Sequence, residues 1–200
     1  GPAHFYLAHR LVKGLVPDFA YLGLVPVLFA VPAFLALVHL LRSVPAGNPA
    51  RDTLLALFGG AALFFVTLIF PTQFDRQWIT VGWACEGVAL AWLFRRVPHP
   101  GLRLVAVGLL VAAFARLALN PAVLHYHPRA ATPIWNWFLY AYGLTTLCLF
   151  AGARLLAPPR QLVLGRNVVP LLCTLGTVLA FLLLNIEIAD YFSTGPRIEF

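Results

Sequence analysis

The sequence has no methionine, only one lysine beside 13 arginines, and only seven acidic residues among 200. Charged residues make up 10% of the chain, whereas a soluble domain carries about 25%. With 61% hydrophobic residues, this shortage of charge excludes a water-soluble fold. It also excludes disorder, which needs low hydrophobicity and high net charge. Because methionine is missing even at position 1, we expect a processed chain or a fragment of a longer protein.

Signals of secretion and of nucleic-acid binding are missing too. Residues 1–6 show no basic region, apolar run or small-residue cleavage site, so they do not form a signal peptide. The formal net charge is +7, but the arginines lie scattered at the ends of apolar runs and form no stripe. Such placement is typical of membrane-topology signals. We therefore expect the lipid bilayer as a partner, and no nucleic acid.

The sequence also lacks signatures of catalysis. It has no Gly-x-Ser-x-Gly elbow, no phosphate-binding Gly-x-x-x-x-Gly-Lys loop and no His-Glu-x-x-His helix. Cys85, Cys148 and Cys173 each fall in an apolar run, with no second cysteine or histidine at ligand spacing. We interpret the three cysteines as packing residues, and we expect no metal and no cofactor.

Long apolar runs are what the sequence does contain. A bilayer core of about 30 Å takes about 20 mainly apolar helical residues to cross. Six runs meet or approach that length, at residues 19–41, 53–70, 78–94, 102–119, 134–156 and 168–189. The predicted fold class is therefore all-α, a polytopic transmembrane helical bundle of about six spans within residues 17–192. Residues 1–16 would end a preceding helix or lie at the interface, and residues 193–200 would form an outer loop leading to further sequence.

Basic residues on the two sides of these runs indicate an orientation, because short cytoplasmic loops are enriched in lysine and arginine. The loops after the first, third and fifth runs hold eight arginines: Arg42, Arg51, Arg95, Arg96, Arg103, Arg154, Arg160 and Arg166. The opposite side holds five basic residues: Arg10, Lys13, Arg76, Arg129 and Arg197. This bias places both termini and the loops after the second and fourth runs outside the cytoplasm.

Two charged residues lie inside predicted spans. Glu86 falls well within the third run, where a charge costs at least about 2.5 kcal/mol, so it should face protein or a water-filled cavity, or be protonated. It is either a proton or substrate group or a residue paired for helix packing. Arg116, four residues before Asn120 in the fourth run, is its natural partner, or that of Glu187. The alternative for Arg116 is a side chain that reaches the membrane interface.

The last run leads to two carboxylates. Positions from Gly176 through Leu183 to Glu187 and Asp190 follow a spacing of three or four, so they share one helix face. Two carboxylates one turn apart can share a cation, bind a sugar or perform acid–base chemistry. They can equally form a solvated helix end. Asn185 points away from that face, where it could hydrogen-bond a neighbouring helix instead.

The predicted outer loops hold the remaining candidates. Asp75 and Arg76 lie in the loop after the second run, and His125 and His127 lie in the loop after the fourth. Two histidines at this spacing without a third ligand are a weak metal signal. Six aromatic residues gather near the same boundary, as an aromatic belt or as sugar-stacking groups: Trp78, Trp83, Trp135, Trp137, Tyr140 and Tyr142.

Four strings carry a resemblance to a known family. They lie at residues 74–84, 120–121, 126–129 and 183–192, and the most specific is Asn-Ile-Glu-Ile-Ala-Asp-Tyr-Phe at the end of the last run. They resemble an uncharacterised family of long, multi-pass bacterial inner-membrane proteins, a domain of unknown function. The resemblance covers most of residues 70–200. It implies a bacterial inner membrane and a larger polytopic protein, and it brings no mechanism with it.

Three functions remain open from the sequence. In the first, Glu86, Arg116, Glu187 and Asp190 line a path for transport or lipid flipping. In the second, an envelope enzyme acts on a glycan or lipid-linked substrate, with Asp75, Glu187 or Asp190 as base or metal ligand. In the third, the chain is an accessory subunit packed against the rest of its own protein or against other membrane subunits. We predict a role in envelope transport or processing, with the accessory role as the alternative.

Overall fold

The computed structural model describes residues 7, 10–11, 24–45, 48, 50–68, 78–120, 122–123, 134–195 and 198. Its long helices are α2 (Leu24–Ser43), α3 (Arg51–Thr67), α5 (Trp78–Arg96), α6 (Pro100–Ala118), α7 (Trp137–Leu155) and α8 (Val169–Phe192). A two-stranded antiparallel hairpin, β1 (Leu162–Val163) and β2 (Arg166–Asn167), joins α7 to α8. The helical bundle expected from the sequence is therefore confirmed.

Four of these helices are long and apolar enough to cross a membrane: Val25–Ser43, Pro100–Ala118, Trp137–Leu155 and Val169–Phe192. The longest, α8, has 24 residues and a length of about 36 Å at 1.5 Å per residue, more than the bilayer core needs. By contrast, α3 has 17 residues, and α5 carries Glu86 together with two arginines in its last turn. Within the described residues, length and composition thus fit membrane crossing for four helices, and the expected six spans are not confirmed.

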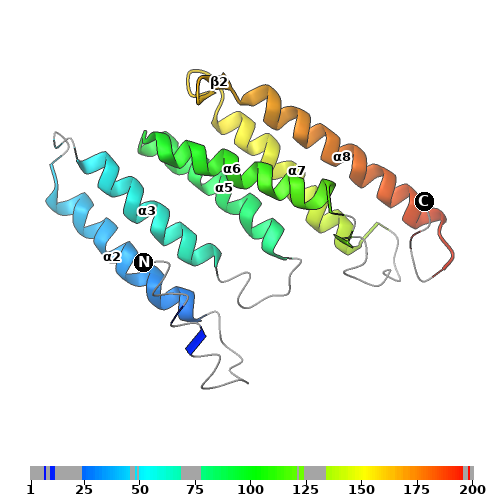
Figure 1. Ribbon diagram of the computed structural model, residues 1–200, viewed down its shortest axis with the longest axis horizontal. Helices are drawn as coiled ribbons and strands as arrows, with labels where there is room; N and C mark the ends of the chain where they lie inside the picture. Colours follow the sequence, from blue (N-terminus) through cyan, green and yellow to red (C-terminus); the bar gives the residue numbers. More distant parts are fainter. Residues whose placement is uncertain are drawn as a thin grey trace.

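The helices form three hairpins that stand side by side (Figure 1). Each pairs two helices consecutive in the chain: α2 with α3, α5 with α6, and α7 with α8. The second and third hairpins merge into one four-helix unit, because α5 packs on α7 and α6 contacts both α7 and α8. The first hairpin joins this unit mainly through α3 and α5.

Leu110 of α6 lies at the centre of the four-helix unit and is fully buried. Glycines on two neighbouring helices make room for it. A Cβ atom added at Gly87 of α5 would lie 2.8 Å from Cγ of Leu110, and one added at Gly152 of α7 would lie 2.5 Å from its Cδ1. Small residues at such contacts let membrane helices approach closely.

The first hairpin has its own small core, formed by Val25, Ala30 and Phe65 with Phe29 and Leu68 packed against it. The rings of Phe29 and Phe65 lie 5.5 Å apart between centroids and are tilted by 34°. This separate core fits an arrangement in which the first hairpin forms as a unit and docks on α5.

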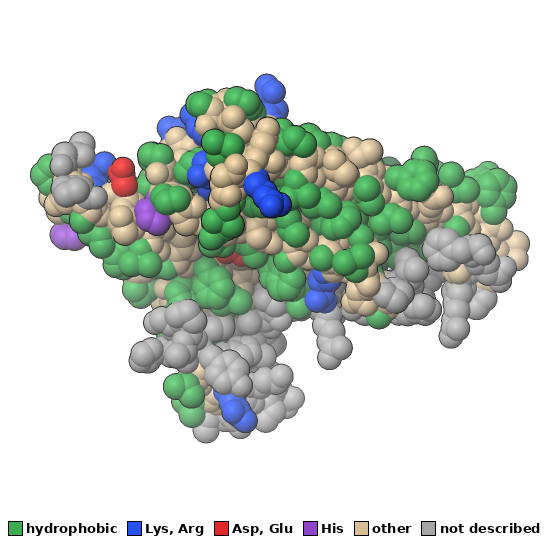
Figure 2. Space-filling view, turned by 45° about the horizontal axis from the view of Figure 1, so that its top comes forward, with side chains coloured by type: hydrophobic (Ala, Val, Ile, Leu, Met, Phe, Trp, Pro, Cys, Tyr) green, Lys and Arg blue, Asp and Glu red, His purple; other side chains and the backbone are tan. Residues whose placement is uncertain are grey.

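The outer surface of the helices is apolar. Among the exposed side chains are Leu28, Phe34, Leu147 and Phe181, each with more than half of its surface accessible. Figure 2 shows hydrophobic side chains over much of the described part of one face, with Lys and Arg in a few places. Exposed apolar area on this scale marks contact with lipid or another apolar partner, as expected for a membrane bundle.

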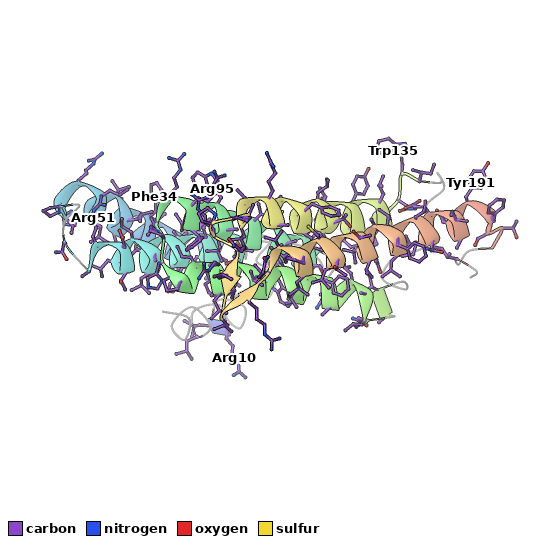
Figure 3. All side chains as sticks on the ribbon, turned by 90° about the horizontal axis from the view of Figure 1, so that it is seen from above. Arg10, Phe34, Arg51, Arg95, Trp135 and Tyr191 are labelled. Atoms are coloured by element: carbon purple, nitrogen blue, oxygen red, sulfur yellow. The ribbon has the colours of Figure 1, made fainter. Side chains whose placement is uncertain are left out.

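The two ends of the bundle differ in charge. We name one the arginine end: it carries the turns that follow α2, α5 and α7, with Arg42, Arg51, Arg95, Arg96, Arg103, Arg154, Arg160 and Arg166. There the guanidinium of Arg103 lies over the Phe94 ring at 5.0 Å and donates to the backbone oxygen of Arg160. The opposite end, which carries Glu187 and Asp190, we name the carboxylate end. In Figure 3, Arg51 lies near one end of the helices, and Trp135 and Tyr191 lie at the other.

Candidate functional site

Asn136 is the centre of the polar cluster at the carboxylate end. It precedes α7 as its N-cap, and its Oδ1 accepts a hydrogen bond from the backbone N–H of Leu139 at 2.9 Å. Asparagine is among the preferred capping residues because its side chain satisfies a backbone donor that the helix leaves free. The cap fixes the amide orientation, so Nδ2 points away from α7 toward α8.

The Nδ2 group of Asn136 donates to Oε2 of Glu187 at 3.0 Å and to Oδ2 of Asp190 at 3.1 Å. Asp190 is 1% exposed and Asn136 is 4% exposed, so the amide and one of its acceptors are withdrawn from solvent. One neutral side chain thus connects two carboxylates and fastens α8 to the start of α7.

The helix face predicted for these carboxylates is the one that packs on α7. A Cβ atom added at Gly176 of α8 would lie 3.1 Å from the Phe150 ring of α7. Leu183 of α8 lies beside Gly143 of α7. Glu187 and Asp190 continue this line to Asn136. The second oxygen of Glu187, Oε1, is buried and has no hydrogen-bond partner within the described part of the chain.

Aromatic side chains lie at the same end of the bundle as the cluster. The Trp78 and Trp137 rings meet edge to face, with centroids 5.8 Å apart. Trp135 is 69% exposed and projects from the same end of the molecule as Tyr191 (Figure 3). Tyr142 is buried deeper, and its hydroxyl donates to the backbone oxygen of Leu117 at 3.0 Å. The exposed rings fit an interfacial position, where aromatic side chains are enriched.

Asn185 takes no part in this cluster. Its side chain is exposed, and Nδ2 donates to the backbone oxygen of Phe181, one turn earlier in the same helix, at 2.7 Å. The hydrogen bond shown for Asn185 thus stays within α8, and does not reach the neighbouring helix that the sequence left open. The backbone oxygen of the preceding turn lies within reach and serves as the acceptor, as is common for short polar side chains in helices.

Glu86 is buried between α5 and α3, apart from the carboxylate end. It is 7% exposed, and the Thr67 side chain of α3 lies near its carboxyl. The Thr67 hydroxyl donates its one hydrogen to the backbone oxygen of Leu63 at 2.9 Å. Glu86 thus faces protein, one of the environments expected for a carboxylate in this position.

Arg116 does not pair with Glu86 or with Glu187, contrary to expectation. Its guanidinium lies 5.9 Å above the centre of the Trp83 ring, while Glu86 meets Thr67 and Glu187 meets Asn136. Asn120, four residues later, accepts a hydrogen bond from the backbone N–H of Ala122 at 3.1 Å and so shapes the turn after α6. Among the described residues, the contacts of Glu86, Arg116 and Glu187 are therefore with three different neighbours.

Four predicted candidates lie outside the described residues: Asp75, Arg76, His125 and His127. Within the described part of the chain, no group of three or more His, Cys, Asp or Glu side chains is placed to hold a metal ion.

Sequence reasoning missed two features of the structure. Asn136 lies between two tryptophans just before an apolar run, which is a recognisable N-cap signal, but its contact with α8 depends on tertiary packing. Cys85 and Cys148, interpreted as packing residues, lie on α5 and α7, two helices that pack on each other. No local spacing could reveal this arrangement, because the two residues belong to different hairpins.

Comparison with known proteins identifies the family. No curated protein and no solved structure matches the chain. The family described as "Predicted membrane protein (DUF2339)" matches residues 3–199, nearly the whole length. The apolar helices of the structure agree with that description. The chain belongs to this family of predicted membrane proteins, whose function is unknown.

Proposed function

We propose that this chain is part of a bacterial inner-membrane protein that acts in envelope transport or processing, with its polar site on the non-cytoplasmic face. The observation that carries the proposal is the Asn136 amide, which donates to both Glu187 and Asp190 at one end of the bundle. Such a buried polar network costs stability unless its groups are satisfied. A role in ligand binding would explain why the chain keeps this polar network at the carboxylate end.

The orientation is supported by the distribution of arginine. Eight arginines lie at the arginine end, and loops rich in arginine stay in the cytoplasm. In this proposal all six helices cross the bilayer, since α3 and α5 run beside the four long apolar helices (Figure 1). The loops after the second and fourth spans then lie in the periplasm, together with the carboxylate end.

The chemistry of the site favours a positively charged ligand. Two carboxylates that share one amide donor repel each other when both are ionised, and a low-dielectric surrounding strengthens this repulsion. Oε1 of Glu187 adds a buried acceptor without a partner in the described part of the chain. We propose that the site takes up a proton or the cationic group of an envelope compound.

The test uses a strain that lacks the protein and is complemented by variants of the full-length chain. Profiles of envelope lipids and glycans would be compared between the deletion strain and its complemented derivatives. Glu187→Gln and Asp190→Asn remove the charges with little change in shape, and we expect them to reach the membrane but to leave the deletion profile uncorrected.

The matched control is Asp52→Asn, which removes an exposed carboxylate in the first turn of α3 at the arginine end. It should restore the wild-type profile. An envelope profile that the deletion leaves unchanged contradicts the proposed role. Full restoration by Glu187→Gln and Asp190→Asn together contradicts the proposed site.

Three local contacts favour the alternative, an accessory subunit without chemistry of its own. Glu86 lies near Thr67, Arg116 meets Trp83, and Asn136 holds α7 to α8, so these three polar side chains already have local packing roles. Under this alternative the deletion would destabilise another membrane protein. Purification from mild detergent, followed by identification of proteins whose abundance falls in the deletion strain, would separate the two roles.

A further inference from the structure

The β1–β2 hairpin carries an apolar side chain at its tip, between basic residues. Leu164 is 84% exposed, more than any other large hydrophobic side chain in the described part of the chain. Arg160 lies just before the hairpin, and Arg166 directly follows the turn, in β2. The hairpin lies at the arginine end, where it joins α7 to α8 (Figure 1). Its tip thus presents an exposed leucine with arginine on both sides.

The conformation of the turn disfavours leucine. Leu164 and Gly165 have φ values of +50° and +77°, and a two-residue type I′ turn requires positive φ at both positions. Glycine, asparagine and aspartate accept this conformation, whereas bulkier residues are uncommon in it. Backbone conformation and contact with water therefore both oppose leucine at position 164. Burial of the side chain in an apolar phase outside the protein would offset these costs.

Two contacts fix the hairpin to the bundle. Val163 of β1 is buried in the main hydrophobic core. The guanidinium of Arg103 on α6 donates to the backbone oxygen of Arg160 at 3.2 Å, and so connects the chain before β1 to α6. Leu164 and Arg166 are therefore held at a defined place, and a ligand meets a surface that is already formed.

Acidic residues are scarce around this hairpin. None of the seven in the chain lies between Glu86 and Glu187, a stretch that includes α6, α7 and the hairpin. Among the described residues, Asp52 of α3 is the only carboxylate at the arginine end, whereas Arg154 and Arg166 are exposed there. Such a surface attracts anions, and the guanidinium group binds phosphate with two parallel hydrogen bonds.

Trp92 indicates where this end lies in the membrane. It is exposed on α5, one turn before the helix ends, and the Arg96 guanidinium lies 5.5 Å from the centre of its ring. Exposed tryptophan is enriched at the level of the lipid headgroups. The hairpin, at the same end of the bundle, is therefore within reach of headgroups.

We infer that the β1–β2 hairpin and the arginines beside it bind an anionic phospholipid of the surrounding bilayer. Leu164 enters the boundary between headgroups and acyl chains, and Arg154 and Arg166 contact the lipid phosphate. A lipid supplies both the anion and the apolar phase, whereas a soluble phosphate supplies the anion alone. The inference is independent of the proposed function, because it concerns the end opposite to the two carboxylates.

The test uses the full-length protein purified in detergent. Native mass spectrometry measures the dissociation constant of the first bound dioleoylphosphatidylglycerol, and that of zwitterionic dioleoylphosphatidylcholine. We expect phosphatidylglycerol to bind about 20-fold more tightly, because each of two arginines near the lipid contributes about fivefold. Excess inorganic phosphate should not displace it. Equal affinities for the two lipids overturn the inference, and displacement by phosphate overturns the assignment of a lipid.

Two arginine variants separate a local site from a general effect of charge. Arg166→Gln removes one charge beside the hairpin tip, and we expect it to weaken phosphatidylglycerol binding about fivefold. The matched control is Arg42→Gln, which removes an exposed arginine in the last turn of α2, at the same end but on the first helical hairpin. It should leave the affinity unchanged. Equal effects of the two variants overturn the site.

A leucine variant tests the tip. Leu164→Asn suits the turn better, so its melting temperature in lipid-free detergent should not fall. Its affinity for phosphatidylglycerol should fall at least about tenfold, because the buried leucine is lost. The control is Leu119→Asn, which changes a 75% exposed leucine at the carboxylate end and should bind the lipid as before. Unchanged affinity of Leu164→Asn overturns the inference. A lowered melting temperature does so too, because it would show that the tip packs on the protein.

Discussion

Asn136 combines two tasks in one side chain. Its oxygen caps α7 through Leu139, and its nitrogen binds Glu187 and Asp190 of α8. The amide is suited to both because it carries an acceptor and two donors. Aspartate would cap the helix equally well but would face the two carboxylates with a third. The cap alone would accept asparagine or aspartate at position 136, and the contact with α8 selects asparagine.

We predict that Asn136→Ala lowers the free energy of unfolding by about 2.5 to 4 kcal/mol. Loss of a cap costs about 1 kcal/mol, and loss of hydrogen bonds to charged groups adds about 1.5 to 3 kcal/mol. The matched control is Asn167→Ala, since exposed Asn167 only accepts from the backbone N–H of Val169. Unfolding of both variants in detergent, followed by circular dichroism, measures the difference. Equal losses for the two variants would show that the contact with α8 adds nothing.

Thr145 of α7 illustrates the opposite case, a polar group without a visible role. It is fully buried, and its hydroxyl has no hydrogen-bond partner in the described part of the chain. We predict that Thr145→Val, which keeps the shape and removes the hydroxyl, stabilises the protein by about 1 kcal/mol, because an unsatisfied buried group costs about 1 to 3 kcal/mol. A rise in the melting temperature in detergent would confirm this. Destabilisation would instead indicate that the hydroxyl binds something in the folded protein.

At the scale of elements, helix packing depends on where glycine faces a neighbour. A Cβ atom added at Gly87 would lie 3.0 Å from the backbone oxygen of Ala106 and even closer to Leu110. The backbone cannot yield as a side chain can. Around Gly108 of α6, by contrast, no atom lies within 4 Å of an added Cβ. Two glycines on paired helices thus have opposite structural roles.

We predict opposite effects for the two alanine substitutions. Gly87→Ala should destabilise the bundle by about 1 to 3 kcal/mol, the usual cost of overpacking. Gly108→Ala should stabilise it by about 0.5 to 1 kcal/mol, because alanine is the better helix former. Unfolding midpoints of the two variants in the same detergent provide the measurement. A loss of stability in both would contradict the role assigned to the α5–α6 contact.

The sequence predicts the positions of helices far better than it predicts side-chain contacts between helices. Apolar runs located six helices, and the three-to-four spacing from Gly176 to Asp190 identified the face of α8 that packs on α7. These features repeat along one chain segment, so they are visible locally. The neighbour of Glu86, by contrast, lies on another helix, at a place set by how hairpins dock. Charge alone suggested Arg116 for Glu86, but docking placed Thr67 beside it.

At the scale of the whole molecule, the two ends of the bundle are chemically distinct. Turns at the arginine end are short, as between α5 and α6, where His99 caps the next helix through Gly101. Asn136 and the two carboxylates lie at the other end. The positive-inside rule predicts one orientation from such a difference in charge. A ligand of the carboxylates would then bind on the side of the membrane opposite to the arginines.

This orientation leads to a labelling prediction. In a background of Cys85→Ala, Cys148→Ala and Cys173→Ala, single cysteines would be introduced by Pro98→Cys, in the turn between α5 and α6, and by Thr194→Cys, just after α8. Both positions are exposed. A membrane-impermeant maleimide added to spheroplasts should label the Thr194→Cys protein at once. It should label the Pro98→Cys protein only after the membrane is broken, because the arginine end faces the cytoplasm in the proposed orientation. The reverse pattern would put the carboxylates in the cytoplasm and exclude a periplasmic site.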